Sequence, residues 1–218
     1  MPRWPGATLS ASRPMESRDT MAVATPPPVA FSPLLRRYTL EEFWTLPDPD
    51  GRAHYELIGG SLFMVPPPDA PHDDLDARLN TSLIAFLLGH GMPGRVYHPR
   101  AAIYAGDTYL EPDMMYVSHV LAARMGARRT SADIAFEYLS RSTVTYASTT
   151  KADTYLALGV RELWLIDPET ATIEVRHAIA GPARPVWEVH RYARGEWAES
   201  RVLLGWRVSV DELFAGLV

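Results

Sequence analysis

Residues 133–167 read DIAFEYLSRSTVTYASTTKADTYLALGVRELWLID, and this stretch predicts a strand, a loop, a helix and a second strand. The first strand is expected over residues 133–139, and the helix from about Thr150 to Leu158. Residues 162–167 are almost continuously apolar, which is typical of a buried central strand. We therefore expect an α/β protein with a mixed sheet covered by helices.

The flanking sequence adds further elements of both kinds. A capping-box pattern, Thr39 followed by Glu42, predicts a short helix. The other expected elements are a hairpin over 54–65 turning at Gly59-Gly60, a helix over 73–88, a second hairpin formed by 95–104 and 108–117, strands at 172–178, 185–193 and 196–204, and a last helix from Ser209. No internal repeat is evident, so we expect one domain over residues 34–218.

The first 33 residues differ in composition from the rest of the chain. They contain seven prolines, with scattered Ser, Thr and Ala, and they cannot bury enough apolar surface to offset their ordering entropy. We expect residues 1–33 to form a disordered tail, and Met15 or Met21 could be the true start.

Composition excludes several classes of protein. The 218 residues are 47% hydrophobic and 22% charged, as in globular proteins, and the net charge of −5 argues against a protein that coats nucleic acid. It does not exclude a nuclease, whose acidic centre is neutralised when metal binds. The absence of cysteine excludes disulfides and thiolate metal sites. No apolar run approaches the roughly 20 residues that span a membrane, so we expect no membrane contact and a cytoplasmic location.

Lys151 is the only lysine beside 20 arginines, which suggests that its position needs an ammonium group. If Thr150 caps the helix, this cation opposes the helix dipole at a cost of about 0.3–1 kcal/mol. The i, i+4, i+7 spacing of Lys151, Tyr155 and Leu158 would turn the ammonium toward the end of strand 133–139. The alternative is a lysine that survived by chance on a solvated helix face.

Three carboxylates are candidates for chemistry. Glu137 lies among apolar residues in strand 133–139, where an unpaired charge would be costly. Asp113 lies in a strand-like run after Pro112, and Glu56 lies in the first hairpin. Each could instead be an exposed strand residue. Carboxylates bind Mg²⁺, which activates water and neutralises phosphate charge, and a lysine can orient that water or stabilise the developing phosphate charge.

Other chemistries lack their motifs. No pair of the seven histidines has the HExxH spacing of zinc hydrolases, and no GxGxxG or P-loop is present. Ser140 and Ser142 lack a nucleophile-elbow context. His72 could reach a site from its turn before a helix, although a surface or capping role is the alternative.

Four arginines are candidates for phosphate contacts, and the alternative is an ordinary solvated charged loop: Arg124, Arg128, Arg129 and Arg141.

Several segments resemble a known family. They are YELIGGSL, EPDMMYV, FEYLSRST and KADTYLALGVRELWLIDPE, and they follow the family's order over residues 38 to about 215. The chain resembles the PD-(D/E)xK nuclease superfamily, and within it the bacterial Uma-two family, which is classed with restriction endonucleases. The resemblance implies a restriction-endonuclease-like fold, with a mixed central β-sheet flanked by α-helices.

The resemblance also implies a site. Asp113 and Glu137 match the two metal-binding acids, the backbone carbonyl of Tyr138 would be a further ligand, and Glu56 matches an acidic residue of the first hairpin. The lysine expected two residues after Glu137 is absent, because Leu139 stands there. Lys151 matches superfamily members whose lysine has moved to the neighbouring helix.

Two departures from the family pattern are Arg141, where proline is common, and Ala147, where aspartate is common. The expected function is a Mg²⁺-dependent (or Mn²⁺-dependent) endonuclease acting on DNA, as a homodimer that cuts both strands. The alternative, which Ala147 and the acidic net charge favour, is an inactive relative that serves as a nucleic-acid-binding or protein-interaction module. The hypothesis of a purely structural protein would gain support only if Glu137 and Lys151 were far apart.

Overall fold

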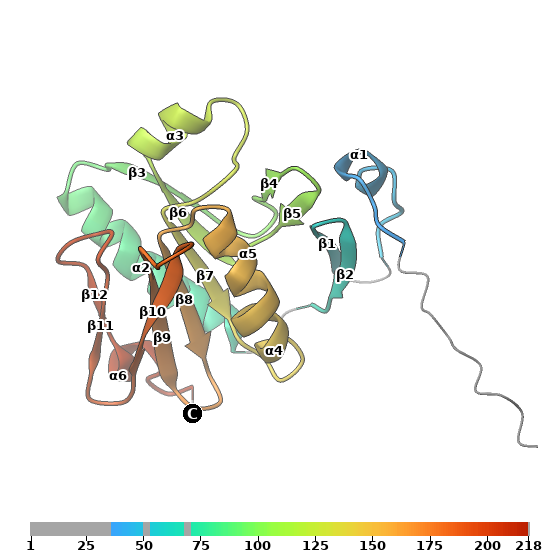
Figure 1. Ribbon diagram of the computed structural model, residues 1–218. Coiled ribbons are helices and arrows are strands. Elements are labelled where there is room, and N and C mark those ends of the chain that lie inside the picture. Colours follow the sequence, from blue (N-terminus) through green and yellow to red (C-terminus); the bar gives the residue numbers. More distant parts are fainter. Residues whose placement is uncertain (1–35, 50–52, 68–70, 218) are drawn as a thin grey trace, which may run out of the picture. The chain divides into compact units, whose positions relative to one another are not determined.

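Two parallel strands and the helical segment between them lie at the centre of the fold (Figure 1). The computed structural model describes residues 36–49, 53–67 and 71–217, so the predicted tail lies outside the described residues. Strand β7 (Ile134–Tyr138) pairs in parallel with β8 (Glu162–Asp167), as expected when a helix connects neighbouring strands. Both strands are buried nearly throughout, which confirms the central position predicted for residues 162–167.

Four antiparallel strands extend this pair into a six-stranded sheet with the order β10-β9-β8-β7-β6-β3. They are β3 (Gly94–Tyr97), β6 (Met114–Ser118), β9 (Thr172–Ile179) and β10 (Val186–Tyr192). The pairings β3–β6, β6–β7, β8–β9 and β9–β10 are all antiparallel, so the sheet is mixed, as predicted.

A second, four-stranded sheet has the order β2-β1-β5-β4. Its strands are β1 (His54–Ile58), β2 (Ser61–Val65), β4 (Ile103–Ala105) and β5 (Thr108–Leu110). The first hairpin is confirmed: β1 and β2 pair around Gly59 and Gly60, whose φ values of 53° and 82° suit a tight hairpin turn.

The second hairpin was predicted only in part. Its turn at Gly106 joins β4 to β5, but each predicted long strand is divided between the two sheets. Pro99 separates β3 from β4, and Pro112 separates β5 from β6. Proline has no N–H to donate to a ladder, so each strand breaks there and its two halves join different sheets.

Helices cover both faces of the six-stranded sheet. The leucines of α2 (His72–Gly89) and the apolar residues of α6 (Val210–Leu213) pack on the face that carries Phe136 and Tyr138. Helix α5 (Ala152–Ala157) packs on the opposite face with Ala135. The remaining elements are α1 (Leu40–Phe43), α3 (His119–Met125), β11 (Trp197–Glu199) and β12 (Arg207–Ser209). No helix in the described ranges is long and apolar enough to cross a membrane.

The helix that carries Lys151 begins earlier than predicted. A helical run starts with α4 (Val144–Tyr146), continues through a π-helical turn (Ala147–Lys151) and ends as α5. The predicted start at Thr150 was wrong, and so was the expected conflict between Lys151 and the helix dipole. Ser, Thr and Val are weak helix formers, yet here Ser148 and Thr149 donate their hydroxyls to carbonyls four residues earlier.

Candidate active site

The site forms where the ladder between β6 and β7 ends. Met114 is paired with Phe136, so one step further along the antiparallel register Asp113 faces Glu137. Pro112 cannot extend the ladder, and the Asp113 carboxylate instead accepts the Tyr138 backbone N–H, with 2.8 Å from N to Oδ2. The two acids therefore lie side by side because of strand register, although 24 positions separate them in the sequence.

Lys151 reaches this point from the helix above the sheet. Its Nζ lies 2.8 Å from Glu137 Oε1, 2.9 Å from Glu137 Oε2 and 3.1 Å from Glu56 Oε1. It also donates to the backbone carbonyl of Glu111 at 3.2 Å. The residue is only 3% exposed, so this ammonium is enclosed by acceptors and nearly excluded from water.

Neutral donors complete the shell around the two glutamates. Tyr155 donates its hydroxyl to Glu137 Oε1 at 2.5 Å, and Tyr146 donates its hydroxyl to Glu56 Oε2 at 2.8 Å. The Glu111 backbone N–H donates to Glu56 Oε1 at 2.8 Å. Buried carboxylates need such partners, because an unsatisfied charge in the interior is expensive.

Two buried glutamates, Glu137 and Glu56, share one ammonium at this site, and their pKa values diverge. Burial raises the pKa of Glu137 to about 8, with the charges of Asp113 and Glu56 adding to burial and Lys151 opposing it. Burial also acts on Glu56, but Lys151 and the hydrogen bonds outweigh it and lower its pKa. Burial alone would lower the pKa of Lys151, and the surrounding carboxylates raise it instead. The lysine therefore stays charged, while Glu137 holds a proton more readily than Glu56.

A small cavity of about 60 Å³ adjoins these groups. Its polar walls include Glu111, Asp113, Glu137 and Lys151. His54 also lines it, and its Nε2 is buried with no hydrogen-bond partner among the described residues. A polar cavity with an unpartnered donor or acceptor suits a polar ligand.

The donor set fits a hard cation bound through few protein ligands. Across residues 36–49, 53–67 and 71–217, no three His, Asp or Glu side chains converge as a cluster that could hold a metal ion. Asp113 and Glu137 nevertheless supply adjacent oxygens, and Mg²⁺ commonly binds through one or two carboxylates while keeping several waters. The residues present therefore fit Mg²⁺ or Mn²⁺ held by two acids, and fit an all-protein metal cage poorly.

Tyr155 lies on the helix face that the sequence predicted for Lys151, and three further residues join the site without having been singled out from the sequence: Asp76, Glu111 and Tyr146. Glu111 stands directly before Pro112 and Asp113, so its position in the sequence could have identified it as a candidate site residue. The others come from helices, and nothing in their local sequence says which carboxylate they face.

Histidine 72 lies near the acids, as the sequence had suggested. Its Nε2 is 3.4 Å from Asp113 Oδ1, and its ring packs against Tyr138 with 4.6 Å between centroids. Burial would lower its pKa, but Asp113 raises it. Asp76 accepts the Tyr138 hydroxyl at 3.2 Å and has His98 Nδ1 at 3.5 Å, so it fixes the Tyr138 ring from the side of α2.

The four candidate arginines are dispersed. Arg124 and Arg128 are exposed on and after α3, which follows the end of β6 opposite to Asp113. Arg129 donates to the Ala102 carbonyl and lies over the Tyr97 ring, which is a structural use of its side chain. Only Arg141 approaches the site, in an exposed ion pair with Glu169.

Arg176 supports the π-helical turn from β9, and we predict that its loss weakens the helix that holds Lys151. It donates to the Ser148 carbonyl at 2.8 Å and to Glu174 at 2.7 Å. Arg176→Met should lower the free energy of unfolding by about 1–3 kcal/mol, because a charge-assisted hydrogen bond is lost, and should speed amide exchange at Lys151. Chemical denaturation and hydrogen exchange measure both effects.

Arg191 provides the matched control. It also forms an ion pair with Glu174, but its side chain is 69% exposed. Arg191→Met should change stability by less than about 0.5 kcal/mol. Equal effects of the two substitutions would contradict the role given to Arg176.

Comparison with known proteins identifies the family and the fold of the chain. The family model Uma2, described as "Putative restriction endonuclease", matches residues 40–217. The chain belongs to the Uma2 family. A solved structure, described as a "putative nuclease belonging to DUF820" from Anabaena variabilis, has a TM-score of 0.66 and 21% identity, and the match covers 83% of this chain and 99% of that chain. At this identity the likeness shows the shared fold. A search of curated proteins gave no match.

In this Uma2 protein the side chains of Leu139 and Lys151 lie over the same end of β7. Leu139 directly follows β7 and stands two residues after Glu137, so the two side chains start from the same side of the sheet. Leu139 packs with the apolar residues of that face, and the ammonium comes from the helix above it. One acid can thus receive its lysine from the strand or from the helix, because both lie over the same end of β7.

Proposed function

We propose that this Uma2 protein is a Mg²⁺-dependent (or Mn²⁺-dependent) endonuclease that hydrolyses phosphodiester bonds in DNA. The observation that carries the proposal is the convergence of Lys151 on Glu137 and Glu56, beside Asp113, at a small polar cavity. Membership of a family described as "Putative restriction endonuclease" supports the choice of DNA. A structural role required Glu137 and Lys151 to be far apart, and they are 2.8 Å apart.

Each residue has a defined part in the proposed reaction. Asp113 and Glu137 would hold the cation, together with the backbone carbonyl of Tyr138. The bound cation would supply charge neutralisation of the phosphate and acidify a water molecule. Lys151 orients the attacking water or stabilises negative charge on the phosphate, and Glu56 fixes the position of the ammonium. In-line attack of water breaks one P–O bond and leaves a phosphate monoester and a hydroxyl.

The proposed assembly is a homodimer. The described part of one chain contains one such site, and cleavage of both strands of a duplex needs two sites that face opposite backbones. Sedimentation of the protein with and without duplex DNA tests this part of the proposal separately from the chemistry.

Asp113→Asn tests the proposed function. We expect the wild-type protein to cleave supercoiled and linear DNA with Mg²⁺ or Mn²⁺ and to lose this activity in EDTA. The substitution should lower the cleavage rate at least about 100-fold, because the amide removes a charged cation ligand. It should also weaken Mn²⁺ binding measured by calorimetry, which needs no turnover.

Asp153→Asn is the matched control, since Asp153 is exposed on α5 and makes the same change of charge. It should cleave at the wild-type rate. Equal cleavage by the Asp113 variant would mean a contaminating nuclease. Absence of cleavage in all proteins, with DNA binding retained, would favour the inactive binding module, to which Ala147 in the cavity wall also points.

A further inference from the structure

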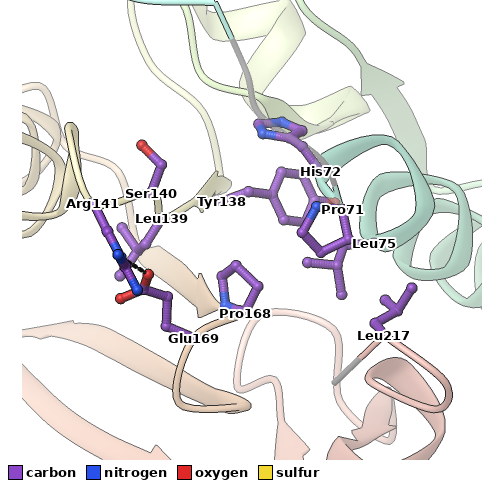
Figure 2. Close-up of a pocket in the computed structure, with 10 residues that line it drawn as sticks. All are labelled: Pro71, His72, Leu75, Tyr138, Leu139, Ser140, Arg141, Pro168, Glu169 and Leu217. Carbon is purple, nitrogen blue, oxygen red and sulfur yellow. Dashed lines mark hydrogen bonds and ion pairs between the residues drawn. The ribbon is translucent and has the colours of Figure 1, made fainter.

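A second, larger cavity opens next to the catalytic one. Its volume is about 360 Å³, which lies within the range of about 300–1,000 Å³ typical of small-molecule sites. Figure 2 shows the residues that line it. His72, Tyr138 and Ser140 line both cavities, so the two adjoin along the end of β7. A ligand bound at Asp113 can therefore extend directly into the larger space.

Apolar and aromatic residues form most of the walls of this cavity. Five lining residues are apolar: Pro71, Leu75, Leu139, Pro168 and Leu217. The rings of Tyr138 and His72 lie together on one side in Figure 2. The Tyr138 hydroxyl donates its proton to Asp76, so it is not free to donate to a ligand. Such surfaces suit a planar, aromatic ligand that stacks.

The mouth of the cavity is polar and carries both charges. Arg141 and Glu169 form an ion pair there, drawn as a dashed line in Figure 2. The Arg141 side chain is 88% exposed, and an exposed pair of this kind is weak enough to exchange partners. Arg141 can then contact a phosphate, and the Glu169 carboxylate can accept from an exocyclic amino group of a base.

We propose that this cavity binds the base of an unpaired nucleotide next to the phosphodiester held at Asp113. The inference rests on the proposed function and narrows its substrate. A backbone that places a phosphate at Asp113 must continue with a sugar and a base, and the shared wall formed by Tyr138 and Ser140 leads to the larger cavity. A base stacked in a duplex cannot enter a side cavity, so the nucleotide must be single-stranded or flipped out.

Oligonucleotides with one 2-aminopurine test this without any cleavage. Binding and 2-aminopurine fluorescence are measured in EDTA for a single strand, a duplex with the probe unpaired, and a fully paired duplex. We expect the unpaired forms to bind at least about tenfold more tightly than the paired one, because no base has to be unstacked. The fluorescence should change when the probe enters the cavity.

Two substitutions fill the cavity from different elements. Leu139→Trp acts from the end of β7, and Pro168→Trp acts from the turn after β8, so a folding defect in one leaves the other as a test. Each should reduce the preference for unpaired probes to within about twofold by excluding the base. Leu204→Trp, at a side chain that is 79% exposed elsewhere, adds the same indole and should keep the wild-type preference.

Equal affinity of the wild-type protein for paired and unpaired probes would overturn the inference. So would a wild-type preference for unpaired probes in both Leu139→Trp and Pro168→Trp. Such results together with metal-dependent cleavage would leave the proposed function standing. A clear preference without cleavage would support the base cavity and count against the nuclease. Failure to bind any of the oligonucleotides, both in EDTA and with Ca²⁺ as the cation, would overturn both.

Discussion

Replacement of Lys151 by methionine is expected to destabilise the protein by about 3–5 kcal/mol at pH 7 and to lower cleavage at least about 100-fold. The ammonium lies within 3.1 Å of both glutamates, and the site is almost closed to water. Its removal leaves Glu56 and Glu137 without the ammonium that they share. Urea denaturation gives the loss of stability, and a plasmid cleavage assay gives the loss of activity.

A double substitution separates these two effects. Lys151→Met combined with Glu56→Gln removes one charge of each sign, so most of the lost stability should return while cleavage stays abolished. Arg194→Met removes an exposed cation and should alter stability by less than about 0.5 kcal/mol. A folded, fully active Lys151→Met protein would show that the sole lysine has no part in the reaction.

Glu137→Gln is expected to abolish cleavage and yet to stabilise the metal-free protein at pH 8. Glutamine resembles the protonated carboxyl in shape, and the buried site favours that form because it is neutral. At pH 8 the variant should exceed the wild type by about 2–4 kcal/mol in the free energy of unfolding. At pH 4.5 the two proteins should agree within about 1 kcal/mol.

The pH window follows from the direction of the shift. The pKa of Glu137 rises from an ordinary 4.5 to about 8, so between these values the folded protein holds a proton that the unfolded chain releases. This contribution to stability is complete below pH 4.5 and is lost as pH rises through 8, at about 1.4 kcal/mol per pH unit. Denaturation curves in EDTA measure the slope. A wild-type slope identical to that of Glu137→Gln would contradict the raised pKa.

Elements fixed by local chemistry could be predicted from the sequence. Thr39 and Glu42 form the capping box that their spacing indicated, and Gly59-Gly60 turns the first hairpin. Alternation along β7 placed Glu137 and Phe136 on opposite faces, and they pack on opposite faces. These features depend on residues a few positions apart, whose geometry the backbone itself sets.

Elements that depend on distant partners could not be predicted as well. The hydroxyl-rich segment before Lys151 has weak helix propensity, and it is helical because it is packed over the sheet and held at Ser148 by Arg176. The π-helical turn ends at Lys151, and such turns are frequent at functional sites. A π-helical turn closes its hydrogen bond over one residue more than an α-helical turn. A sequence pattern with a period of 3.6 residues gives no sign of that additional residue.

The sequence by itself determined the chemical groups: one lysine, the acids at Asp113, Glu137 and Glu56, and a strand–helix–strand unit that could bring them close. Only the tertiary structure decided how they meet. Strand register sets Asp113 opposite Glu137, and packing places one buried ammonium between Glu137 and Glu56. The base cavity also appears only in three dimensions, because its walls come from α2, the ends of β7 and β8, and the C-terminal region. Register, burial and cavities depend on residues far apart in the chain, which local patterns do not encode.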